Sequence, residues 1–152
     1  MTELETGINI VENAIKKMNI DPVACRGDKT GQYNMVQGSI SIWIDVWHNE
    51  REQCAYFQVM SPILDILKVE NKSALYEELL TINDGLYNVS FTIYNNFVWL
   101  KTTREVQGLD ESEVMAQIRR VGNYGDRYDD VLKQKYNPTS PTSTNVAGSQ
   151  PQ

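Results

Sequence analysis

The residues best suited to nucleophilic or metal chemistry are few and form no recognised motif. The chain has one histidine, His48, and two cysteines, Cys25 and Cys54. A thiol and an imidazole can act as nucleophile and base, so a pair formed by Cys54 and His48 remains open. Neither cysteine belongs to a CxxC pattern and no HExxH occurs, so no metal site is predicted. Two cysteines indicate a reduced cytoplasmic protein, although one disulfide between them also remains open.

One glycine-rich segment superficially suggests phosphate binding. In Gly27-Asp28-Lys29-Thr30-Gly31, a Lys-Thr pair lies between glycines. A P-loop needs a glycine directly before the lysine and a helix after it, whereas here Asp28 precedes the lysine and strands are expected to follow. We therefore interpret this segment as a loop and predict no cofactor.

Charged side chains on the expected last helix are the remaining candidates. One helix surface would bring together the carboxylates of Asp126, Asp129 and Asp130. The adjacent arginines Arg119-Arg120 come one to two turns earlier. Mixed charges at these spacings are typical of a solvated helix surface. No catalytic residue is predicted from them.

Composition limits the possible partners. The chain has 152 residues, with 14 Lys and Arg against 20 Asp and Glu, for a net charge of −6. This acidity disfavours nucleic-acid and anionic-membrane partners, and a nucleic-acid site would require the cations Lys29, Lys101, Arg104 and Arg119 to gather on one side. The first residues are acidic and no run of 18 apolar residues occurs, so we expect a cytoplasmic protein with no membrane span.

The first half of the chain predicts a helix and three strands. Thr2 and Glu5 have the spacing of a capping box at the start of a helix that ends before Asp21-Pro22. Alternating apolar residues then indicate strands over 33–37, 39–47 and 53–60, the last ended by Pro62. A loop over 49–52 would pair Val46 with Ala55, Ile44 with Phe57 and Ile42 with Val59.

The second half predicts a helix over 72–83, a hairpin of strands 86–94 and 97–103, and a last helix capped by Asp110. Gly122 and Gly125 would weaken the middle of that helix. The fold class is therefore α+β, with a five-stranded antiparallel sheet and the order α-β-β-β-α-β-β-α. Residues 1–136 are predicted to form a single domain, and the polar residues 137–152 a disordered tail.

Large aromatic residues gather on the predicted sheet surface that faces away from the core. This set comprises Trp43, Trp47, Tyr56, Tyr94, Phe97 and Trp99. Such side chains dominate the energetics of protein interfaces, so we predict a protein-binding surface here. The alternative is that a helix of the same chain, or the linker over 63–69, covers it. Tyr76 and Leu80 fall outside the main apolar stripe of the second helix and are candidate dimer contacts.

The order of elements resembles the YbjN-like family, which shares the fold of type III secretion chaperones. The resemblance covers about residues 3–135 and includes Leu79-Leu80-Thr81-Ile82-Asn83, the hairpin over 85–100 and Gly108-Leu109-Asp110-Glu111. It implies a small, acidic, bacterial, non-enzymatic protein. Secretion chaperones of this fold are typically homodimers that hold an extended client segment, and YbjN-like proteins are described as regulators. The family offers no motif residue whose role could be transferred.

We therefore predict a non-enzymatic, homodimeric protein-binding module, chaperone-like or a regulatory adaptor, for an unknown protein client. The alternative is a small-molecule-binding protein or an enzyme with a pocket between the sheet and the helices. A deep pocket with convergent polar groups would favour this alternative.

Overall fold

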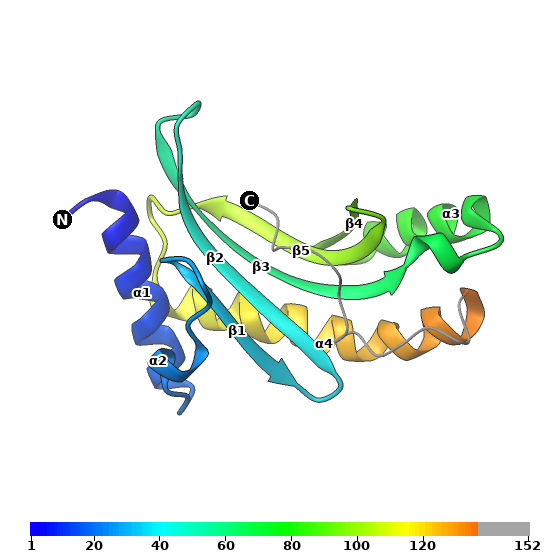
Figure 1. The fold of residues 1–152 in the computed structure, drawn as a ribbon, viewed down its shortest axis with the longest axis horizontal. Coiled ribbons are helices and arrows are strands. Elements are labelled where there is room, and N and C mark those ends of the chain that lie inside the picture. Colours follow the sequence, from blue (N-terminus) through cyan, green and yellow to red (C-terminus); the bar gives the residue numbers. More distant parts are fainter. Residues whose placement is uncertain (137–152) are drawn as a thin grey trace.

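The computed structural model describes residues 1–136, so the predicted tail over 137–152 lies outside the described residues. Four α-helices, a short 3-10 helix and five strands follow one another along the chain (Figure 1). In chain order they are α1 (Glu3–Lys17), α2 (Pro22–Cys25), β1 (Gln32–Gln37), β2 (Ile40–Asn49), β3 (Cys54–Asp65), η1 (Ile66–Lys68), α3 (Lys72–Asp84), β4 (Ser90–Tyr94), β5 (Phe97–Glu105) and α4 (Glu111–Tyr136).

The strands form one antiparallel sheet in the order β1-β2-β3-β5-β4. Side chains of α1, α3 and α4 share a single buried core with the alternating apolar residues of the sheet, among them Ile44, Phe57 and Leu100. In Figure 1, α3 and β4 lie together at one end of the molecule, and α1 lies at the other. The predicted α+β class with a five-stranded antiparallel sheet is confirmed.

Helix starts follow the predicted capping residues. The Thr2 side chain accepts a hydrogen bond from the Glu5 backbone N–H at 3.1 Å, and the Glu5 carboxylate accepts one from the Thr2 backbone at 2.7 Å. At the start of α4, Asp110 accepts from the Glu113 backbone at 2.8 Å. The hydrogen bonds from Ser112 and from this backbone stabilise the charged carboxylate, and they lower the pKa of Asp110.

The predicted register between β2 and β3 is wrong by two residues. Val46 pairs with Phe57 and Ile44 with Val59, because the strands separate after the pair Asn49–Cys54. The loop is displaced by one residue, with Gln53 in the left-handed region at φ 56°. A shift of two residues leaves every side chain on its predicted side of the sheet.

Strand β3 does not end at Pro62, as the sequence predicted, but continues to Asp65. Proline has no backbone N–H to donate to a neighbouring strand. Pro62 is tolerated because it pairs only with β5, opposite Trp99, and the pairing of β3 with β2 has already ended at Met60. A register irregularity between Pro62 and Leu64 accommodates the proline. The supposed linker over 63–69 therefore begins as sheet, and it buries Ile63 in the core.

The glycines of α4 allow this helix to approach the β1–β2 hairpin closely. A side chain at Gly122 would collide with the carboxamide of Gln37, and a Cβ at Gly125 would lie 2.5 Å from Ile40 Cδ1. The expectation of a solvated acidic helix surface is wrong for one residue: Asp129 is buried, with Ser39 Oγ at 3.3 Å and Lys133 Nζ at 3.7 Å. Burial raises the pKa of Asp129.

Candidate functional site

The predicted aromatic residues lie on the side of the sheet opposite the helical core. In β2, Ile42, Ile44 and Val46 are buried in the core, so Trp43 and Trp47 point to the other side. Cross-strand pairs extend this side over β3, β5 and β4: Trp47 lies opposite Tyr56, and Tyr94 opposite Phe97. We call the six residues Trp43, Trp47, Tyr56, Tyr94, Phe97 and Trp99 the aromatic surface.

One group of rings on this surface surrounds Trp99. Its ring meets Trp43 edge-on with centroids 5.2 Å apart, and Phe97 lies at 6.1 Å. The Trp99 indole N–H donates to the Tyr94 carbonyl at 3.1 Å. Trp99 is only 2% exposed, so it does not present a ring to a partner, contrary to the sequence prediction. It supports its partly exposed neighbours instead.

A second group is formed by Trp47 and Tyr56, whose rings stack at 5.7 Å. The Tyr56 hydroxyl donates to Glu52 at 3.4 Å. A hydrogen bond with Cys54, together with desolvation and nearby negative charge, raises the pKa of Tyr56 to about 12. The phenol is therefore neutral at physiological pH and keeps its proton for hydrogen bonding.

A polar row separates the two groups of rings. Asp45, Gln58 and Thr103 lie opposite one another across β2, β3 and β5, and the Thr103 hydroxyl donates to the Gln58 carboxamide at 3.0 Å. Asp45 and Gln58 are buried, whereas Thr103 is exposed, so Thr103 is the residue of this row that a partner can reach. Partly exposed rings with a hydroxyl between them suit an extended polypeptide, which presents both side chains and unpaired backbone groups.

Exposed apolar residues also gather at the end of the molecule that holds α3 and β4. Leu80 is 70% exposed, whereas Tyr76 packs partly against the core. The two predicted dimer contacts therefore differ, and only Leu80 is freely accessible. We call the exposed residues of this segment the apolar end: Leu67, Leu80, Tyr87, Ile93 and Tyr94.

The chemical candidates from the sequence are not brought together. His48 pairs with the core residue Ala55, whereas Cys54 pairs with Asn49 on the aromatic side. The imidazole and the thiol therefore point to opposite sides of the hairpin and form no nucleophile–base pair. Both cysteines are free thiols, which excludes the disulfide in this structure. Within residues 1–136, no three potential metal ligands are grouped.

The four cations considered for nucleic acid are also dispersed. Lys101 and Arg104 lie on β5, Arg119 lies on α4 and Lys29 lies in the loop before β1. The Arg104 guanidinium forms an ion pair with Glu113. Across the described part of the chain, no helix is long and apolar enough to cross a lipid bilayer.

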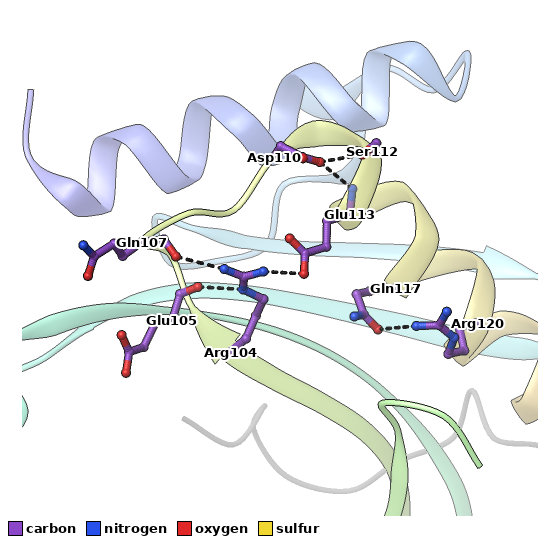
Figure 2. A network of polar contacts seen from close by, with 8 residues as sticks. All are labelled: Arg104, Glu105, Gln107, Asp110, Ser112, Glu113, Gln117 and Arg120. Carbon is purple, nitrogen blue, oxygen red and sulfur yellow. Dashed lines mark hydrogen bonds and ion pairs between the residues drawn. The ribbon is translucent and has the colours of Figure 1, made fainter. Parts of the chain in front are cut away.

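A recess of about 760 Å³ lies where β5 continues beyond β4. The pairing of the two strands ends at Ser90 and Lys101, so β5 has an open edge from Thr102 to Glu105. Figure 2 shows how Arg104 closes one end of this recess: its guanidinium donates to the carbonyls of Glu105 and Gln107, both at 2.9 Å, and contacts Glu113. The volume suits a small ligand, but these internal contacts engage the guanidinium.

The sequence predicted neither the recess nor the burial of Trp99. Strand β4 begins at Ser90 and not at Leu86, as the sequence predicted. One local signal for this later start is Asn88, which adopts φ 56°, a region that asparagine tolerates. Burial of Trp99 depends on rings contributed by two strands and has no local signal.

Comparisons with known proteins agree with this architecture. The family model described as T3SS (YopN, CesT) and YbjN peptide-binding chaperone 1 matches residues 5–138. No curated protein matches the chain. A chain in the crystal structure of the ExsC–ExsE complex is similar with a TM-score of 0.64 at 11% identity, covering 87% of this chain and 97% of that one. A chain in the HopA1–SchA chaperone–effector complex gives 0.56 at 6% identity, covering 80% and 91%.

Proposed function

The chain belongs to the family of T3SS and YbjN peptide-binding chaperones, and we propose that it binds an extended protein segment on its aromatic surface. Membership makes it a peptide-binding, chaperone-like module. The finer proposal is that it works as a homodimer, as a chaperone or regulatory adaptor, and catalyses no reaction. Both similar chains come from complexes, one of them a chaperone–effector complex, which supports a protein client here.

The observation that carries the proposal is the pattern of the aromatic surface. Trp43, Trp47 and Tyr56 are partly exposed on the side of the sheet away from α1 and α4. Buried Trp99 fixes the Trp43 ring from below. Rigid, partly exposed rings bind at low entropic cost, because little side-chain freedom remains to be lost.

Peptides selected from a random display library against the purified protein provide the test. Their affinity is then measured by fluorescence anisotropy for the variants Trp43→Ala and Trp47→Ala. If the rings are central contacts, each change weakens binding by about 2 kcal/mol, or roughly thirtyfold. Val23→Ala, at an exposed apolar residue of α2 outside the proposed binding surfaces, is the control and leaves affinity unchanged. Selected peptides that bind both tryptophan variants as tightly as the wild type would refute the proposal.

The homodimer is proposed on the apolar end, which shares Tyr94 with the aromatic surface and otherwise consists of different residues. Five large apolar side chains are exposed there, and β4 is an edge strand of the sheet. Monomers rarely expose apolar residues in such a cluster, and edge strands provide unpaired backbone groups to a second copy. Light scattering coupled to size-exclusion chromatography tests this directly. Leu80→Glu converts the dimer to monomer, whereas Val23→Glu, at a comparably exposed residue of α2, does not. A monomeric wild type would contradict the dimer alone.

A further inference from the structure

A second recess, of about 310 Å³, lies on α4. Arginines and small or polar side chains on successive turns of the helix form it. We call it the arginine groove, and it is lined by Ala116, Arg119, Arg120, Asn123, Tyr124 and Arg127. The apolar positions of α4, such as Ile118 and Val121, are buried against the sheet instead.

Two of the three guanidinium groups in this groove have side-chain contacts that orient them, and neither contact is with a carboxylate. Arg127 lies over the Tyr124 ring, 5.7 Å from its centroid, and Arg120 donates to the Gln117 carboxamide at 3.4 Å. Among the ion pairs of residues 1–136, none includes Arg119, Arg120 or Arg127.

This local charge is opposite to that of the whole protein, which carries a net −6. Grouping like charges within about two helical turns destabilises a helix slightly, and nothing in the fold requires it at exposed positions. A concentrated field of this kind attracts and orients an oppositely charged partner. Guanidinium groups bind carboxylates through paired hydrogen bonds, which gives geometric selectivity as well as attraction.

We propose that the arginine groove binds an acidic, extended segment of a partner protein. Arg120 and Arg127 are seven residues apart, which corresponds to about 10 Å along a helix at ~1.5 Å per residue. A chain in the extended polyproline II conformation has three residues per turn and advances about 3.1 Å per residue, so carboxylates three positions apart lie on one side of the chain and match this spacing. Binding here goes beyond the proposed function, because the groove and the aromatic surface occupy different elements and one segment need not displace another.

Fluorescence anisotropy with a defined acidic probe tests the proposal. The probe is a fluorescein-labelled peptide of 12 residues, Asp-Gly-Ser repeated four times, measured at about 50 and 150 mM NaCl. Its comparator has Asn at each Asp position. The groove variant is Arg120→Glu with Arg127→Glu. The control variant, Lys29→Glu with Arg51→Glu, makes the same change in net charge at exposed loop positions, and circular dichroism checks that both fold.

The expected result is that the wild type binds the Asp peptide and not the Asn peptide. The groove variant then binds about tenfold more weakly, and the control variant changes by less than about threefold. Equal losses in the two variants, or equal binding of the two peptides, would overturn the proposal. Tighter binding of a 12-residue oligothymidylate would also overturn it in favour of nucleic acid. Trp43→Ala leaves this binding intact, which separates the result from failure of the aromatic surface.

Discussion

Replacing Trp99 by alanine should destabilise the fold far more than the same change at its neighbour Trp43. A buried tryptophan removes about 150–250 Å² from solvent, which at ~25 cal/mol per Å² is about 4–6 kcal/mol. Measured costs of Trp→Ala in cores are about 3–5 kcal/mol. The Trp99 ring is 2% exposed and donates a hydrogen bond to Tyr94, so we expect a loss in this range. Partly exposed Trp43 should cost about 1–2 kcal/mol.

Urea denaturation followed by circular dichroism measures both losses, and an unchanged slope confirms comparable unfolding transitions. Domains of this kind have about 5–15 kcal/mol to lose, so Trp99→Ala could prevent folding. Trp99→Phe provides the second measurement: it keeps an apolar ring, removes the hydrogen bond to Tyr94 and should cost about 1–2 kcal/mol. Equal losses for Trp99→Ala and Trp43→Ala, or a loss below about 1 kcal/mol for Trp99→Ala, would refute the view that buried Trp99 supports the aromatic surface.

Two further predictions concern α4. Gly125→Ala should destabilise the fold by about 1–2 kcal/mol because buried Ile40 cannot move away. Gly122→Ala should be neutral or stabilising because the Gln37 carboxamide can rotate outward. Equal effects of the two variants in urea denaturation would contradict this prediction. Asp129 has a raised pKa in the folded state, so folding favours its protonated form. As the pH falls from 7 through the folded pKa, the wild type should therefore gain stability relative to Asp129→Asn. No further gain is expected below the unfolded pKa. A flat difference in unfolding free energy between pH 7 and 4 would show that Asp129 does not titrate in this way.

Local signals in the sequence predicted the elements and their sides. The capping residues Thr2 and Asp110 mark helix starts through bonds made within three residues, and alternation from Ile40 to Val46 assigns one side of β2 to the core. These signals depend on neighbours in sequence. The assignment of side chains to the two sides of the sheet stays correct despite the register error of two residues between β2 and β3, because side-chain direction repeats with a period of two.

Features that depend on distant segments could not be predicted in this way. Pro62 continues β3 because the pairing of β3 with β2 has already ended at Met60, which only the arrangement of the sheet decides. Asp129 is buried because α4 approaches the turn that contains Ser39. The arginine groove was interpreted as two ordinary surface residues, Arg119 and Arg120, although helical periodicity alone places Arg127, seven residues after Arg120, on the same side of α4.

The open edge of β5 has a consequence for self-association. The Val106 amide donates to the Ala55 carbonyl, so the Glu105 carbonyl points away from β3, toward solvent. Arg104 occupies this acceptor with its own guanidinium. A strand of another molecule that paired with this edge of β5 would first have to displace the Arg104 guanidinium. Its backbone would also lie against the positive charge of that group. The contacts of Arg104 therefore disfavour the addition of a further strand at this open edge of the sheet.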